Sequence, residues 1–148
     1  MSAFKGSFSI VIDEKNRLSL PAKRRRASQA AVNDQFVITL GLEGCLFVFA
    51  ADEWQKIEDK LRNLSFTQTN ARLFIRMLLS QATDAELDRQ GRITLPQSLL
   101  DQAKLKKEKE ALVVGNLNRI EIWSTIVWDN YLKNSSQTYE QVAESILL

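Results

Sequence analysis

The first hydrophobic pattern of the chain predicts β-structure. Residues 7–12 begin with apolar and serine positions in alternation, residues 13–16 are polar, and residues 17–20 alternate again. Asn16 ends the polar stretch and belongs to the residue types that tolerate a positive φ angle. The pattern therefore predicts a β-hairpin whose turn needs a left-handed residue directly before Arg17.

A second hairpin is predicted further along the chain. Phe36–Leu40 and Leu46–Phe49 are short apolar runs, and Gly41 and Gly44 lie between them. Short apolar runs of this length, bounded by glycine, are typical of paired strands.

Helical periodicity follows the second hairpin. An acidic start at residues 52–53 precedes apolar residues spaced by 3, 4 and 3 positions, which are Trp54, Ile57, Leu61 and Leu64. Residues 70–82 are more apolar and predict a second helix.

The order of these elements is repeated in the second half of the chain. Residues 13–21 and 88–96 carry Asp, Arg and Pro at the same three spacings, so Gly91 corresponds to Asn16. Both turns are thus expected to need a left-handed residue before the Arg, and Pro21 and Pro96 suit the first position of a helix.

The repeat continues downstream, where the spacing between equivalent positions changes from 75 to 74 residues. The second hairpin is repeated by Leu112–Val114 and Ile120–Trp123, with residues 115–118 between them, and Trp128 corresponds to Trp54. Thr125–Lys133 and residues 137–148 correspond to the two helices. We therefore expect two pseudo-symmetric α+β units, residues 1–74 and 75–148, packed as one body.

Charge is distributed unevenly. The net charge is only +2, but residues 1–26 contain seven basic and two acidic residues. Such an excess favours an anionic partner, nucleic acid being the commonest, and an ordinary solvated basic face is the alternative.

The composition excludes several classes of function. The chain has 148 residues, no His and a single Cys, Cys45, which excludes His-dependent nucleophiles, His-ligated metals and an internal disulfide. We find no Gly-rich phosphate loop. The one catalytic arrangement that the sequence does not exclude is a set of carboxylates brought together from distant positions in the chain. We expect no enzyme, cofactor, metal or small-molecule substrate.

Targeting signals are also missing from the pattern. The longest apolar run, Cys45–Ala51, is far shorter than the ~20 residues of a membrane-spanning helix. The first residues lack the basic and then apolar order of a signal peptide. We expect a cytoplasmic protein without a membrane partner.

Two Asp-x-x-x-Arg motifs about 75 residues apart, each leading into a strand and a Pro, resemble the MraZ family. The resemblance covers essentially the whole chain, with one departure, since Asn16 stands where the family usually has Gly. It implies an AbrB-like swapped-hairpin fold in each half. It also implies a nucleoid-associated bacterial transcriptional regulator that binds directly repeated boxes upstream of its own operon in the division and cell-wall gene cluster. By the same resemblance the protein forms rings, and Arg17 contacts double-stranded DNA.

The chemistry of the motif agrees with that role. An Arg on a two-stranded β-ribbon can enter the major groove and bind guanine O6 and N7, a contact worth about 1–3 kcal/mol in discrimination. For Asp13 and Asp88 we favour a structural role, in which each carboxylate accepts N–H groups of its turn. Arg92 has equivalent geometry in less basic surroundings, so we expect it to matter less for DNA.

The basic run at residues 23–26 predicts phosphate contacts. If Pro21 starts a helix, these cations lie near its positive end, at a cost of about 0.3–1 kcal/mol each. The second half has residues 97–101 there instead, without a cation. Because successive helix residues point ~100° apart, we expect about two of the four to face DNA. Our expected DNA contacts beside Arg17 are Lys15, Lys23, Arg24 and Arg25.

Other conspicuous residues are expected in the core. Trp54 and Trp128 lie on apolar helix stripes, Trp123 ends a strand, and Cys45 is expected to be a buried thiol.

The weak DNA affinity expected of a single subunit favours an oligomeric protein. One subunit with a few cationic contacts binds DNA weakly, whereas linked copies gain avidity. Head-to-tail copies in a ring present the same face in the same direction, which predicts direct repeats about 10 bp apart. The runner-up function is a protein-interaction or antitoxin-like assembly module with weak, non-specific DNA affinity.

Overall fold

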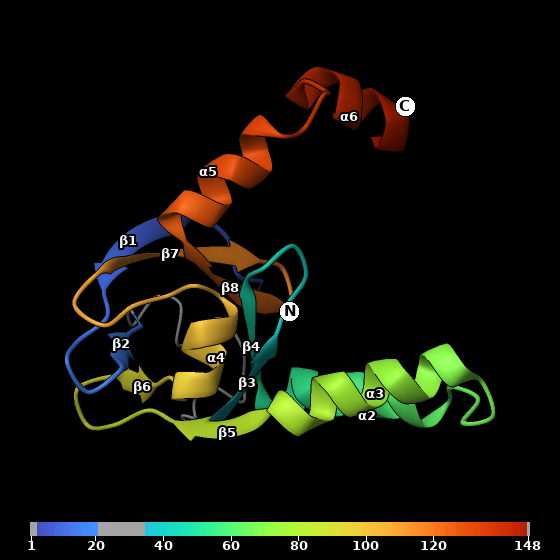
Figure 1. The fold of residues 1–148 in the computed structure, drawn as a ribbon, viewed down its shortest axis with the longest axis horizontal. Coiled ribbons are helices and arrows are strands. Elements are labelled where there is room, and N and C mark those ends of the chain that lie inside the picture. Colours follow the sequence, from blue (N-terminus) through green and yellow to red (C-terminus); the bar gives the residue numbers. More distant parts are fainter. Residues whose placement is uncertain (1–2, 21–34, 148) are drawn as a thin grey trace.

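The computed structural model describes residues 3–20 and 35–147. The strands are β1 (Ser7–Val11), β2 (Arg17–Ser19), β3 (Gln35–Leu40), β4 (Leu46–Ala50), β5 (Thr83–Glu86), β6 (Arg92–Thr94), β7 (Glu110–Asn116) and β8 (Arg119–Ser124). The helices are α2 (Ala51–Arg62), α3 (Thr69–Gln81), α4 (Gln97–Gln102), α5 (Thr125–Lys133) and α6 (Tyr139–Leu147). The protein thus has the α+β composition that the sequence predicts (Figure 1).

Six strands form one antiparallel sheet in the order β1-β7-β8-β4-β3-β5. The hairpins β3–β4 and β7–β8, both predicted, lie side by side at its centre, where Leu46 pairs with Ile122 and Val48 with Ile120. The outer strands are exchanged, because β1 pairs with β7 of the second half and β5 pairs with β3 of the first. The two halves therefore share one sheet.

The hairpin predicted from residues 7–12 and 17–20 is wrong in its pairing. β2 pairs with β6, the same strand of the other half, through Arg17–Thr94, Leu18–Ile93 and Ser19–Arg92. The turn at residues 13–16 determines that the chain changes direction, but it does not determine which strand β2 pairs with. The partner of so short a strand is decided by burial, and Leu18 and Ile93 are fully buried in this exchange.

The hydrophobic core lies where the sheet, the β2–β6 ribbon and α4 meet. Its fully buried side chains come from both halves and include Ile12, Leu18, Ile93, Leu99, Ile120 and Ile122. Burial of one such side chain is worth about 1.5–3 kcal/mol. This shared core holds the two motif turns in fixed positions relative to each other.

The start of α4 differs by one residue from its prediction. Pro96 is the residue before the helix, with φ −59° and ψ 143°, rather than the first helical residue. Its carbonyl accepts the N–H groups of Leu99 and Leu100, at 3.1 and 3.0 Å. The fixed φ of proline suits both positions, so the motif does not distinguish them. Pro21, its counterpart, lies outside the described residues.

The four helices predicted after the second hairpins are present. Of the first stripe, Trp54 is buried against Val37 and Phe49, and Ile57 packs beside them, whereas Leu64 lies beyond the end of α2. Helices α3 and α6 bury no side chain completely. Figure 1 shows α2 and α3 projecting from one side of the sheet and α5 and α6 from another.

Trp54, Trp123 and Cys45 are buried as predicted, whereas Trp128 is only half-buried. Trp123 is buried and contacts Trp128 and Tyr131, with ring centroids 5.0 and 5.4 Å away. Cys45 is buried and donates to the carbonyl of Leu42. Burial is the main reason that the pKa of Cys45 is raised to about 12.

Candidate nucleic-acid interface

The first Asp-x-x-x-Arg turn is organised around the carboxylate of Asp13. Its Oδ1 accepts the backbone N–H groups of Lys15 at 2.9 Å and Arg17 at 2.8 Å. Its Oδ2 accepts Nε of Arg17 at 2.7 Å. Asn16 adopts φ 62°, the left-handed conformation expected before Arg17. One carboxylate therefore fixes both the turn and the direction of the Arg17 side chain.

The second turn repeats this geometry. Oδ1 of Asp88 accepts the N–H groups of Gln90 and Arg92, both at 2.9 Å, and Oδ2 accepts Nε of Arg92 at 2.8 Å. Gly91 has φ 76° at the position of Asn16. The two motifs are thus structurally equivalent.

The β2–β6 ribbon places the two turns side by side. The carbonyl of Gly91 accepts the N–H of Leu20 at 2.9 Å, and the carbonyl of Asn16 accepts the N–H of Leu95 at 2.8 Å. A longer ion pair of 3.9 Å joins Nη1 of Arg92 to Oδ2 of Asp13. Both turns lie at the same edge of the molecule, beside β2 and β6 in Figure 1. They form one surface rather than two separate sites.

The two Arg side chains are held but not enclosed. Arg17 and Arg92 retain 27% and 23% of their side-chain accessibility. Each Nε is taken by the carboxylate of its own motif, and among the described residues no hydrogen bond is formed by the Nη atoms of Arg17. An Arg fixed at Nε can direct its Nη pair at an acceptor without losing further side-chain freedom.

The electrostatics of the turns favour ionised carboxylates. Partial desolvation raises the pKa of Asp13, but the backbone N–H and guanidinium of Arg17 and the N–H of Lys15 outweigh it, so the pKa lies below its ordinary 3.8. The N–H of Arg92 is the largest influence on Asp88 and, with its guanidinium and the N–H of Gln90, lowers that pKa despite desolvation. Both motifs are charged ion pairs at neutral pH.

One polar contact distinguishes the first turn. Nδ2 of Asn16 donates to Oε1 of Gln97 at 3.3 Å, and Nε2 of Gln97 donates to Oδ1 of Asp101 at 2.9 Å. Gly91 has no side chain for such a contact. The first turn is therefore tied to α4 through side chains.

The expected DNA contacts fall into two groups. Lys15 is exposed in the first turn. Lys23, Arg24 and Arg25, together with Arg26, lie outside the described residues.

Within the two turns themselves, the second carries the more positive charge. Arg89, exposed in the second turn, stands where the first turn has Glu14.

A second cationic segment was not singled out from the sequence. Lys104, Lys106, Lys107 and Lys109 are exposed in the loop between α4 and β7. The signal was four lysines within six positions, in a half of the chain with a slightly negative balance.

In residues 3–20 and 35–147, no group of three or more Cys, Asp or Glu side chains is arranged to hold a metal ion. In the same residues no helix is long and apolar enough to cross a membrane.

The comparison with protein families gives one match that occurs twice. The model described as "MraZ protein, putative antitoxin-like" matches residues 3–77 and again residues 78–148. The junction of the two matches lies within α3, as does the boundary at residues 74 and 75 expected from the repeat.

Similar curated proteins span the same length. Transcriptional regulator MraZ of Desulforamulus reducens is 45% identical over 144 residues, which cover 97% of each chain. The proteins of that name from Natranaerobius thermophilus and Moorella thermoacetica are 43% and 45% identical over 97% of this chain and 96% of their own. With two family matches that together span nearly every residue, the chain belongs to the MraZ family.

Proposed function

We propose that the protein is a sequence-specific, DNA-binding transcriptional regulator that binds directly repeated boxes upstream of its own operon as a homo-oligomer. The observation that carries the proposal is the pair of equivalent Asp–Arg turns side by side on the β2–β6 ribbon. The relatives named as transcriptional regulators support the regulatory part. The genes regulated are those of the division and cell-wall cluster, and the role is non-enzymatic and cytoplasmic, at the nucleoid.

Base reading is assigned to the two guanidinium groups. A two-stranded ribbon fits the major groove, where the Nη pair of an Arg can bind O6 and N7 of guanine. Asp13 and Asp88 hold Arg17 and Arg92 in place before DNA arrives. Arg17 is the principal reader, and Arg92, 3.9 Å from the same Asp13 carboxylate, is the second.

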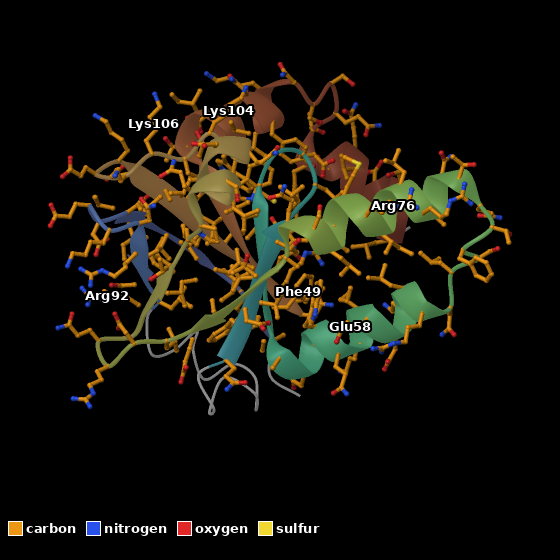
Figure 2. All side chains as sticks on the ribbon, turned by 60° about the horizontal axis from the view of Figure 1, so that its bottom comes forward. Phe49, Glu58, Arg76, Arg92, Lys104 and Lys106 are labelled. Carbon is orange, nitrogen blue, oxygen red and sulfur yellow. The ribbon has the colours of Figure 1, made fainter. Side chains whose placement is uncertain are left out.

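The assembly is assigned to the projecting helices. Helices α2 and α3 enclose an apolar groove of about 310 Å³ with the sheet, lined by Trp54 and Ile57 of α2, Phe74 and Met77 of α3, and Phe49. Figure 2 shows α2, labelled at Glu58, and α3, labelled at Arg76, extending side by side from the sheet end that carries Phe49. Exposed apolar surface of this kind marks an interface.

The occupant proposed for this groove is α6 of a second copy. Helix α6 buries none of its side chains, although Tyr139, Val142 and Ile146 form an apolar stripe along it. Groove and helix lie on different parts of the molecule, so each copy can give α6 to one neighbour and receive it from another. Such head-to-tail contacts close into a ring whose subunits face DNA in the same direction.

Fluorescence anisotropy with a labelled duplex from upstream of the gene tests the DNA-binding proposal. We expect tight binding to this duplex, weak binding to a scrambled one, and a loss of about tenfold or more for Arg17→Ala on the native duplex, since a bidentate guanine contact is worth about 1–3 kcal/mol. Lys60→Ala, which removes an exposed cation of α2, is the matched control and binds as the unchanged protein does.

The second candidate is a protein-interaction module, favoured by the antitoxin-like wording of the family description. It predicts weak and equal binding of both duplexes, unaffected by Arg17→Ala. That result would contradict DNA reading by the ribbon.

A further inference from the structure

The loop between α4 and β7 is fixed directly beside the first motif turn. The N–H of Ile12 donates to the carbonyl of Lys109 at 3.0 Å, and the carbonyl of Ile12 accepts the N–H of Glu108 at 2.6 Å. Ile12 is the residue immediately before Asp13. A segment nearly one hundred positions away in the chain is therefore part of the edge that carries the Asp–Arg turns.

The backbone of this loop is fixed by a buried leucine and by hydrogen bonds to α4 and within the loop. Leu105 is buried in the core, and its N–H donates to the carbonyl of Leu100 at 2.9 Å. Further bonds run from the N–H of Lys104 to Asp101 and from that of Lys109 to Lys106, both at 3.2 Å. The backbone is thus fixed, while the lysine side chains extend into solvent.

Positive charge is concentrated on this loop. Lys104, Lys106, Lys107 and Lys109 are exposed, and among the described residues none of the four takes part in an ion pair shorter than 4.0 Å. Lys104, Lys106 and Lys109 line one hollow of about 450 Å³, whose other lining is Leu105, Glu110, Ser124 and the start of α5. Lysines so close together repel one another unless an anion lies between them.

The motif turn itself lacks the charge that DNA binding needs. Residues 13–17 contain two acidic and two basic side chains, so this turn carries no net charge with which to neutralise phosphates. Half or more of the hydrogen bonds in protein–DNA interfaces are made to the sugar–phosphate backbone of the DNA, and much of the binding affinity is electrostatic. A base-reading turn of this composition needs cations on a neighbouring element.

The repeat shows where those cations are in each half. Residues 23–26 of the first half are all basic, whereas their counterparts in the second half, residues 98–101, lie within α4 and include Asp101 and no cation. The four lysines follow that helix directly. The second half thus has its positive charge on the loop after α4 instead of within α4.

We infer that the Lys104–Lys109 loop binds the phosphate backbone of duplex DNA next to the groove that the first Asp–Arg turn enters. Figure 2 shows Lys104, Lys106 and Arg92 on the side of the molecule away from α2 and α3. The inference rests on the proposed function and adds a contact to it: the loop supplies affinity and orientation, and the turns supply sequence discrimination.

The test is the salt dependence of anisotropy for two loop variants, Lys104→Gln with Lys106→Gln, and Lys107→Gln with Lys109→Gln. The matched control is Lys60→Gln with Lys133→Gln, two exposed lysines on α2 and α5. Each phosphate contact removed lowers the slope of log affinity against log salt by about 0.9. We expect a slope reduced by about 1 or more for at least one loop variant, equal weakening on native and scrambled duplexes, and no change for the control.

The outcomes separate the inference from the proposed function. Loop variants with the slope of the control would overturn the inference, as would a loss confined to the native duplex, which would mean base reading. Failure of the unchanged protein to prefer the native duplex would instead overturn the proposed function. Circular dichroism melting of each variant shows that fold is retained, because all four loop side chains are exposed.

Discussion

Leu18 and Ile93 lie opposite each other at the centre of the β2–β6 ribbon, and neither side chain has any accessible surface. They are equivalent positions of the two repeats. The contact joins the strands that directly follow the two Asp–Arg turns, so one buried pair holds both candidate DNA-reading turns together. The site therefore depends on the exchange of strands between halves.

Leu18→Ala is expected to destabilise the whole protein. Removal of a fully buried Leu side chain leaves a cavity and costs about 2–5 kcal/mol. Urea unfolding followed by circular dichroism measures the loss, and Leu132→Ala, at a side chain of α5 that is 53% exposed and outside the apolar groove, serves as the control with a change below about 0.5 kcal/mol. Equal effects of the two substitutions would contradict the central place of the ribbon.

Stability is expected to fall in acid through the two motif carboxylates. The pKa values of Asp13 and Asp88 are lowered in the folded protein. The stabilisation is thus fully present above the unfolded pKa near 3.8 and is lost as the pH falls through the lower folded values.

Thermal unfolding between pH 2 and pH 6 measures this dependence. The unchanged protein should lose more of its Tm over that interval than the double variant Asp13→Asn with Asp88→Asn, in which these groups no longer titrate. Parallel pH profiles would show that the two carboxylates are not stabilised by their turns.

The left-handed residue of the first turn gives a graded prediction. Asn16 has φ 62°, which costs a residue other than Gly or Asn roughly 1–2 kcal/mol. Asn16→Ala should therefore lower the free energy of unfolding by about 1 kcal/mol, whereas Asn16→Gly loses only the contact to Gln97 and stays within about 0.5 kcal/mol. Chemical denaturation distinguishes the two, and an Ala variant as stable as the Gly variant would contradict the role of the turn conformation.

Assembly is expected to depend on the groove between α2 and α3. Met77→Glu places a charge in the apolar groove at a side chain that is 55% exposed, so the subunit fold is retained while the oligomer dissociates. Deletion of residues 139–148 should do the same, because α6 buries no side chain of its own subunit. Light scattering after size exclusion gives the mass.

Ser80→Glu, which adds the same charge on the exposed part of α3 outside the groove, is the control and keeps the oligomer. If both Met77→Glu and the deletion stay assembled, α6 is not the occupant of the groove.

Local sequence was sufficient for the turns and for most elements. Asp at the first position, Arg at the fifth and Asn16 or Gly91 between them are enough to specify a turn with a left-handed residue, because every bond involved lies within five residues. The hairpins β3–β4 and β7–β8 are equally local, and α5 has the predicted ends.

Strand partners could not be predicted in this way. β2 pairs with a strand about 75 positions away, and only the burial of Leu18 against Ile93 decides that choice. The position of the lysine loop beside the first turn depends on its backbone hydrogen bonds to Ile12, which no local pattern reveals. The exchange of strands between the halves was implied by the resemblance to swapped-hairpin proteins. The hydrophobic periodicity predicted a local hairpin instead.

Methylation interference on the promoter duplex tests the central claim most directly. Dimethyl sulfate modifies guanine N7 in the major groove, the atom that the Nη groups of Arg17 are proposed to bind. The account predicts that methylation blocks binding at guanines that recur in direct repeat about 10 bp apart, and that Arg17→Ala removes this pattern. Interference arranged as an inverted repeat, or binding indifferent to guanine N7 methylation, would contradict it.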